Sequence, residues 1–156
     1  MKLEMTNFTN LNEAECRMVL EWRNHPNIRN YMSNKNIITK EEHLNFIKRL
    51  EQDNKKKYFL IKEGDEYLGV IDFIDIERGS CEFGLYATPY NHKKGVGSLL
   101  LEEIIRYAFD ELKVKKIRAK LYKENKKALG LYEKYGLKTT CEDEEYFYME
   151  LKKQTI

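Results

Sequence analysis

The chain has 156 residues, 42% of them hydrophobic and 35% charged, which is one domain's length and too apolar a composition for a disordered chain. We therefore expect a single domain over residues 1–156 with its own hydrophobic core. The 28 Lys and Arg residues against 26 Asp and Glu residues leave a net charge of +2, which argues against duplex nucleic acid or an anionic membrane as a partner.

Targeting and redox features favour a cytoplasmic protein without a metal centre. No apolar run approaches the ~20 residues of a membrane-spanning helix, and the N-terminal residues lack the apolar stretch of a signal peptide. The cysteines Cys16, Cys81 and Cys141 are far apart, and an odd count without metal-binding spacing is typical of reduced thiols. With only 3 scattered histidines, we expect no metal.

The first third of the chain predicts one strand and two helices. The strand lies near Leu3–Phe8. Two capping boxes introduce the helices, since Asn12 precedes Glu15, and Thr39 precedes Glu42, at the spacing of an N-cap and its N3 partner. Apolar residues at helical spacing follow each box. They are Ala14, Met18 and Trp22 in the first helix, and Leu44, Ile47 and Leu50 in the second.

The middle of the chain predicts an antiparallel meander and a strand–helix–strand unit. Strands are expected over Tyr58–Ile61, Tyr67–Ile76 and Cys81–Ala87, with glycine-containing turns between them. A helix with the 3.6-residue period is expected over Ser98–Leu112, and a strand over Ile117–Tyr122. The strand–helix–strand unit requires a parallel pair, so the sheet is expected to be mixed.

The last part of the chain predicts a helix over Lys126–Tyr135 and two strands around the acidic run Glu142–Glu145. Asn125 is the expected N-cap of this helix, and Gly136 stands just past its end. The complete element order describes an α/β (α+β) protein with a mixed central sheet of about seven strands and flanking helices.

A glycine-containing loop, His92-Lys93-Lys94-Gly95-Val96-Gly97-Ser98, follows the meander and opens the central helix. The first turn of a helix has free backbone N–H groups and the positive end of the helix dipole. Gly95 and Gly97 let an anion approach the backbone, and Lys93 and Lys94 add positive charge. The loop therefore indicates a pyrophosphate site, with an ordinary glycine turn as the alternative. Its spacing is neither that of the Walker loop nor that of the dinucleotide fingerprint.

The next helix contains a second motif, Asn125-Lys-Lys-Ala128-Leu-Gly-Leu131-Tyr132-Glu-Lys-Tyr-Gly136-Leu137. The two segments together resemble the signature motifs of the GCN5-related N-acetyltransferase (GNAT) superfamily, Gln/Arg-x-x-Gly-x-Gly/Ala and Asn-x-x-Ala-x-x-Leu-Tyr-x-x-x-Gly-Phe. The resemblance spans residues 80–140 and departs from the first motif at His92, which stands in the place of Gln or Arg.

The resemblance implies a GNAT fold that binds acetyl-coenzyme A in a V-shaped splay between two parallel strands, here Cys81–Ala87 and Ile117–Tyr122. The first strand would pair with the pantetheine arm, the loop amides would hold the pyrophosphate, and Asn125 would fix the arm besides capping its helix. No metal is implied. The expected cofactor-binding residues are Leu85, Tyr86, Ala87, His92, Lys93, Lys94, Gly95, Val96, Gly97, Ser98 and Asn125.

Acetyl transfer to an amine requires a base for the amine and an acid for the leaving thiolate. In the resemblance Tyr132 is the general acid, and a phenol with a pKa of ~10 can protonate a thiolate whose thiol has a pKa of ~8.5. The alternative is a core aromatic on a short amphipathic helix. Glu82 is the candidate base, directly or through water, and its alternative is a surface carboxylate on an alternating strand.

Three segments resemble a narrower group, the nucleotide-aminosugar N-acetyltransferases of the pseudaminic acid pathway. They are Phe8-Thr-Asn-Leu-Asn12, Trp22-Arg23-Asn24-His25-Pro26 and His43-Leu44-Asn45-Phe46-Ile47. The resemblance implies acetylation of the 4-amino group of UDP-4-amino-4,6-dideoxy-N-acetyl-β-L-altrosamine, a precursor for flagellin glycosylation. The expected substrate-binding residues are Arg23, Asn24, His43 and Tyr86.

The residues leave alternatives open for this acceptor side. Arg23 could pair bidentately with a diphosphate or be a solvated arginine at a helix end. His43 could contact the nucleotide or sugar, or be a surface histidine near a helix cap. Because a Trp-Arg-Asn motif also occurs in acetyltransferases of protein N-termini and small amines, such an acceptor is the alternative substrate. A non-catalytic acyl-coenzyme A sensor is a second alternative, which Tyr132 argues against.

The segment from Lys113 to Lys127 is strongly basic. Without interleaved stacking aromatics or a reading helix, it favours a solvated face that attracts the phosphates of coenzyme A rather than nucleic acid. A monomer and a homodimer are both compatible with the sequence.

Overall fold

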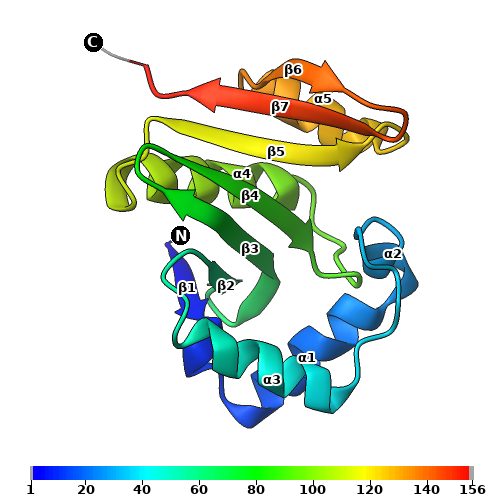
Figure 1. Ribbon diagram of the computed structural model, residues 1–156. Coiled ribbons are helices and arrows are strands. Elements are labelled where there is room, and N and C mark those ends of the chain that lie inside the picture. Colours follow the sequence, from blue (N-terminus) through cyan, green and yellow to red (C-terminus); the bar gives the residue numbers. More distant parts are fainter. Residues whose placement is uncertain (1, 155–156) are drawn as a thin grey trace.

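The computed structural model describes residues 2–154, whose centre is one mixed sheet of seven strands in the order β1-β2-β3-β4-β5-β7-β6 (Figure 1). Neighbouring strands are antiparallel except β4 and β5, which are parallel as predicted. The strands are β1 (Leu3–Asn7), β2 (Lys57–Glu63), β3 (Glu66–Glu77), β4 (Ser80–Ala87), β5 (Lys116–Tyr122), β6 (Lys138–Glu142) and β7 (Tyr146–Lys152). The predicted α+β class and mixed sheet of about seven strands are confirmed.

Local sequence signals place the helices. Both capping boxes form, with the Glu15 amide donating to Asn12 Oδ1 at 2.8 Å and the Glu42 amide donating to Thr39 Oγ1 at 3.1 Å. The helices are α1 (Glu13–Asn24), α2 (Pro26–Arg29), α3 (Lys40–Leu50), α4 (Val96–Arg106), which continues in a π-helical turn over Tyr107–Glu111, and α5 (Lys126–Lys134). Within residues 2–154, no helix has the length and apolar character needed to cross a membrane.

The sequence prediction lacks two short elements, a 3-10 turn over Phe8–Asn10 and the helix α2. Pro26 does more than end α1, because it is the first residue of the short helix α2, where its missing N–H and fixed φ suit a helix start. His25 caps α2 by accepting a hydrogen bond from the Asn27 amide at Nδ1, at 3.1 Å. The chain therefore turns at Pro26 and continues as helix.

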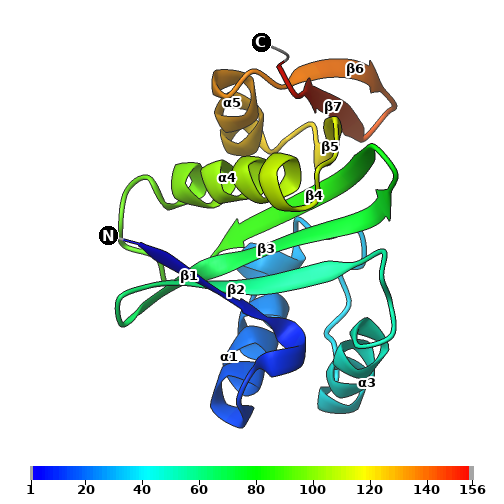
Figure 2. The ribbon, with the colours of Figure 1, turned by 90° about the vertical axis from the view of Figure 1, so that its left-hand side faces the viewer.

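The helices cover the two faces of the sheet separately (Figure 2). On one face α4 and α5 enclose the larger core, to which β4 contributes Cys81 and Phe83. On the other face, here called the α1–α3 face, α1 and α3 cover a smaller core that includes Val70 of β3 and Tyr86 of β4. Because side chains alternate along a strand, Asp72, Glu82 and Gly84 also lie on the α1–α3 face.

The buried stripes of α1 and α3 agree with the predicted ones at Met18, Trp22, Ile47 and Leu50, and each differs at one position. Leu44 was expected to face the core and is 47% exposed, and Ala14 is also exposed. In α3 the inward positions are His43, Phe46, Ile47 and Leu50, a regular i, i+3, i+4, i+7 set. The predicted stripe of α3 is therefore wrong only at Leu44, and the inward positions that it lacked are His43 and Phe46.

The parallel strands part after a short paired stretch. They pair only at Ser80 with Lys116, Cys81 with Ile117 and Glu82 with Arg118. Beyond this point β4 pairs with β3 on its other edge and β5 pairs with β7 on its other edge, so the two facing edges diverge (Figure 1). This opening is the predicted V-shaped splay.

Candidate active site

The loop between β4 and α4 presents backbone amides at the start of a helix. Gly95 has a φ of 82°, a left-handed conformation that glycine adopts without steric cost. The Leu99 amide makes the first intrahelical bond, to Gly95 O at 3.1 Å, so the amides of Val96–Ser98 have no acceptor inside the helix. A Cβ added at Gly97 would lie 3.2 Å from Leu131 Cδ2, which places the loop directly beside α5.

The basic residues of this loop differ in their partners and in their exposure. The Lys93 ammonium pairs with Glu63 at the end of β2, and the Lys93 amide donates to Asn91 Oδ1 at 2.9 Å. Lys93 therefore already has protein partners for both groups. His92 and Lys94 are exposed. The amides of α4, rather than the lysine side chains, are the main feature that could hold an anion.

The second half of β4 has one free edge. Leu85, Tyr86 and Ala87 pair with β3, opposite Ile71, Val70 and Gly69. Gly69 permits this approach, because a Cβ there would lie 2.2 Å from Tyr86 O. The opposite edge of β4 faces the splay without a strand partner in the described chain. Unpaired strand edges bind extended chains through backbone hydrogen bonds, as the prediction for the pantetheine arm requires.

Asn125 begins α5 as predicted. Its Oδ1 accepts a hydrogen bond from the Ala128 amide at 3.2 Å. Gly136, just past the end of the helix, has a φ of 93°. The capping role of Asn125 is thus confirmed, whereas its contact with a cofactor stays a prediction.

Tyr132 points from α5 into the sheet. Its ring is 6% exposed and meets the ring of Phe83 edge-on at 5.4 Å, so it lies beside the splay on the α4–α5 side. Within residues 2–154 its hydroxyl makes no hydrogen bond with a side chain or backbone group. Burial raises the pKa of Tyr132, and the negative charge of Asp72 raises it further. A buried phenol that keeps its proton can act as a proton donor. The alternative, a core aromatic, explains the packing of the Tyr132 ring but does not explain why its hydroxyl is left without a partner.

Glu82 is half-buried on the α1–α3 face, at the last position where β4 pairs with β5. Burial raises the pKa of its carboxyl group and Asp75 adds to this, whereas Lys120 and Arg118 oppose it. The expected alternative, a surface carboxylate, does not describe this half-buried group. Its position allows it to accept a proton from a group bound in the splay.

Arg23 is not the solvated arginine of the alternative prediction. Its Nη2 donates to Asn34 O at 2.7 Å, whereas its Nη1 is buried without a partner in the described chain. Burial lowers the pKa of the guanidinium, and the nearby Tyr86 and Tyr58 hydroxyls oppose that shift. A buried N–H donor without an acceptor is costly, so this site favours an anionic or carbonyl ligand.

Two more of the predicted substrate residues, Asn24 and His43, are held by contacts within the protein. The Asn24 side chain donates to Ile38 O at 2.8 Å and accepts from the Ile38 amide at 2.7 Å, so both of its polar groups fix the loop between α2 and α3. His43 is 6% exposed, and its Nε2 has no partner in residues 2–154. It contacts α1 near Cys16, about two helical turns from Arg23, and burial lowers its pKa. The surface-histidine alternative is wrong.

Asp72 is the residue that sequence reasoning missed. It lies in the middle of β3 opposite Gly84, and a Cβ added at Gly84 would lie 2.7 Å from Asp72 Oδ2. Burial raises the pKa of Asp72 to about 7, with a further contribution from Glu82 and opposition from Lys56. The available signal was a carboxylate at an inward-facing position of a strand rich in Val, Ile and Phe.

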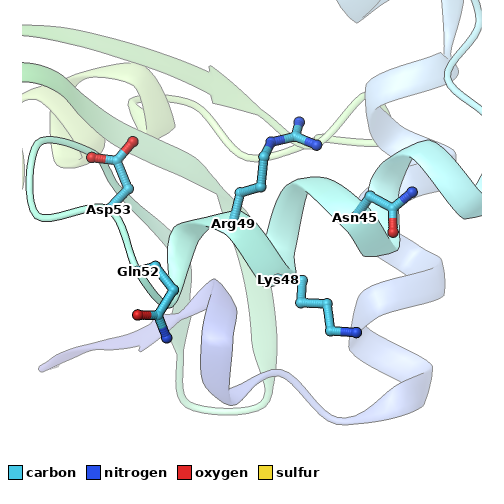
Figure 3. A pocket seen from close by; sticks show the side chains of 5 residues that line it. All are labelled: Asn45, Lys48, Arg49, Gln52 and Asp53. Atoms are coloured by element: carbon cyan, nitrogen blue, oxygen red, sulfur yellow. The ribbon is translucent and has the colours of Figure 1, made fainter.

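A hollow on the surface lies at the end of α3, away from the splay. Its lining comes from the end of α3 and the following turn, and Figure 3 shows these side chains pointing in different directions rather than toward a common centre. They are Asn45, Lys48, Arg49, Gln52 and Asp53. Among the described residues, no group of three His, Cys, Asp or Glu side chains is placed to hold a metal ion.

Comparison with known proteins agrees with this geometry. The family described as acetyltransferase (GNAT) domain matches residues 7–138. Acetyltransferase PseH of Campylobacter jejuni (serotype O:23/36, strain 81-176) is 47% identical over 150 residues, which cover 96% of this chain and 94% of that protein. The crystal structure of C. jejuni PseH in complex with acetyl coenzyme A superposes with a TM-score of 0.83 at 42% identity, covering 98% of this chain and 100% of that one.

A second similar fold is more distant in sequence. Spermidine N-acetyltransferase from Vibrio cholerae, in complex with CoA and spermine, has a TM-score of 0.86 at 22% identity and covers 96% of this chain and 95% of that one. At this identity the likeness shows the fold alone. The motifs, the splayed parallel strands and the match to residues 7–138 agree: the chain belongs to the GNAT acetyltransferase family.

Proposed function

We propose that the protein transfers the acetyl group of acetyl-coenzyme A to the 4-amino group of UDP-4-amino-4,6-dideoxy-N-acetyl-β-L-altrosamine, in pseudaminic acid biosynthesis for flagellin glycosylation. The observation that carries this proposal is the 47% identity to acetyltransferase PseH over 96% of the chain. The buried, unpaired Nη1 of Arg23 adds independent support, because a diphosphate would supply the missing acceptor.

Acetyl-coenzyme A would bind in the splay. Its pyrophosphate would accept hydrogen bonds from the α4 amides at Val96–Ser98, where the helix dipole also favours an anion. The pantetheine arm would pair with the free edge of Leu85–Ala87. Asn125 would approach the arm from the start of α5. With these contacts the thioester would lie where β4 and β5 part, near Tyr132.

The chemical step is a direct displacement. The neutral amine attacks the thioester carbonyl carbon, the new C–N bond forms, and the C–S bond breaks. The thiolate takes its proton from the Tyr132 hydroxyl, which then regains a proton from solvent. The proton lost by the amine goes to the carboxylates on the α1–α3 face, of which Glu82 was predicted from the sequence. The products are an acetamide and free coenzyme A.

The acceptor would approach from the α1–α3 face. Tyr86 and Tyr58 lie close enough to Arg23 to affect its pKa, so all three side chains border one region of that face. A diphosphate held by Arg23 would lie on the same side of the sheet as Glu82. The sugar amine could then reach the splay while the nucleotide stays outside it.

A thiol-release assay with a panel of acceptors tests the function. We expect coenzyme A release with the UDP-4-amino sugar and little with spermidine or an N-terminal peptide. Preference for spermidine or a peptide would establish the alternative substrate class. Binding of acetyl-coenzyme A without thiol release for any acceptor would support the non-catalytic sensor and contradict the proposal.

A further inference from the structure

We propose that Asp72 is the carboxylate that takes the proton from the acceptor amine, and that Glu82 acts through Asp72 rather than on the amine itself. The inference rests on the proposed acetyl transfer and deepens it. It assigns the contact with the amine to a β3 residue, one strand away from the β4 glutamate expected from the sequence.

The position of Asp72 in the sheet is the first argument. Asp72 pairs with Gly84, two residues beyond Glu82, where the pairing of β4 with β5 has just ended. Its Oδ2 would be only 2.7 Å from a Cβ at position 84, so the carboxylate lies over the β4 backbone at the apex of the splay. Glycine at this position is what allows the approach.

The two carboxylates differ in their partners. Glu82 lies opposite Arg118 of β5, and Arg118 and Lys120 both stabilise its charge. Asp72 makes no hydrogen bond or ion pair with any side chain in residues 2–154, and Lys56 alone opposes its protonation. A desolvated carboxylate without a partner is poorly stabilised as an anion, and an ammonium or amine group would stabilise it.

Asp72 also acts on the proposed proton donor. The charge of Asp72 raises the pKa of Tyr132, which approaches the splay from the opposite face of the sheet. An amine at the apex would therefore have the base on one side and the acid on the other. The titratable groups that interact with Asp72 are Lys56 just before β2, Tyr58 on β2, Cys81, Glu82 and Tyr86 on β4, and Tyr132 on α5. Arg23 on α1 interacts in turn with Tyr58 and Tyr86.

The pKa of Asp72 suits a general base. Burial, assisted by the charge of Glu82, raises the pKa of Asp72 to about 7, whereas an ordinary aspartate has a pKa of about 4 and is too weak a base near neutral pH. In the step, the N–H bond of the attacking amine breaks and the proton moves to an Asp72 oxygen. It then leaves to solvent by way of Glu82, so the carboxylate is restored for the next turnover.

Single-turnover rates of three matched variants test the assignment. Asp72→Asn should lower the rate by ~10²–10⁴-fold, the usual value of general acid–base catalysis. Glu82→Gln should lower it less and move the acidic limb of the kcat/KM profile to lower pH, because the charge that helps to raise the Asp72 pKa is gone. The exposed Asp65, in the turn between β2 and β3, is the control, and Asp65→Asn should retain the parental rate.

The outcomes separate this inference from the function. An active parent enzyme combined with a fully active Asp72→Asn variant would overturn the inference and leave the proposed function intact. A Glu82→Gln variant that is slower than Asp72→Asn would assign the base to Glu82. If the Asp72→Asn variant does not fold, the pH profile of the Glu82→Gln variant tests the inference. A shift of the acidic limb of kcat/KM to lower pH would support it, and an acidic limb at the parental pH would overturn it.

Discussion

Replacing Tyr132 with phenylalanine removes the hydroxyl proposed to protonate the leaving thiolate and keeps the ring that packs on Phe83. Because that hydroxyl has no hydrogen-bond partner in the described chain, its loss leaves no protein group unsatisfied, and the melting temperature should hardly change. General acid catalysis is worth ~10²–10⁴-fold, so the barrier should rise by about 3–5 kcal/mol. Affinity for acetyl-coenzyme A should stay close to that of the parent enzyme.

A rapid-mixing single-turnover measurement, with enzyme in excess over acetyl-coenzyme A, isolates the chemical step from product release. A calorimetric titration of the same variant provides the control for cofactor binding. A Tyr132→Phe variant that transfers acetyl groups at the parental rate would refute the proton-donor role and leave Tyr132 a packing residue. Loss of cofactor binding would instead assign it to positioning the thioester.

Four further predictions address the rest of the site. Gly97→Glu should abolish coenzyme A binding in a titration because it brings negative charge to the α4 amides, whereas Gly97→Ala, which adds the same Cβ against the flexible end of Leu131, should still bind. Arg23→Ala should raise KM for the UDP-aminosugar about 10- to 100-fold, from ~1.5–3 kcal/mol for a charge-assisted hydrogen bond, and leave KM for acetyl-coenzyme A unchanged; an equal rise in both would make Arg23 structural. Gly84→Ala should lower kcat, because its Cβ would lie 2.7 Å from Asp72 Oδ2 and displace that carboxylate; parental kcat would argue against its placement. The folded pKa of Asp72 is raised from 3.8 to about 7, so the folded state holds this proton more tightly than the unfolded state and loses stability as the pH rises through that range. Asp72→Asn should therefore raise the melting temperature more at pH 8 than at pH 4, and an equal change at both would contradict the shift.

Features that depend on residues close together in the sequence were predictable. The capping boxes at Asn12 and Thr39, the Asn125 cap and the glycine loop before α4 each depend on residues a few positions apart, and all of them form. The parallel pairing of β4 with β5 follows from the strand–helix–strand order. Such local signals predict the loop, the helix start and the strand pair where we propose that the cofactor binds.

The acceptor side depends on contacts between distant segments. Asp72 becomes a candidate base only through the β3–β4 register that sets it opposite Gly84. The burial of His43 depends on how α3 rotates against the sheet, and the pairing of Asn24 with Ile38 depends on the path of the loop after α2. None of these contacts is encoded by a pattern of neighbouring residues. From the sequence we could therefore predict candidate polar residues, but we could not distinguish those that contact a ligand from those that stabilise the fold.

The most direct test of the central claim is to identify the product. Purified protein is incubated with acetyl-coenzyme A and UDP-4-amino-4,6-dideoxy-N-acetyl-β-L-altrosamine, and the sugar nucleotide is analysed by mass spectrometry and NMR. We predict one added acetyl group, bonded to the nitrogen at position 4, together with stoichiometric free coenzyme A. An unmodified sugar nucleotide, from a protein that acetylates spermidine or a peptide under the same conditions, would contradict this prediction.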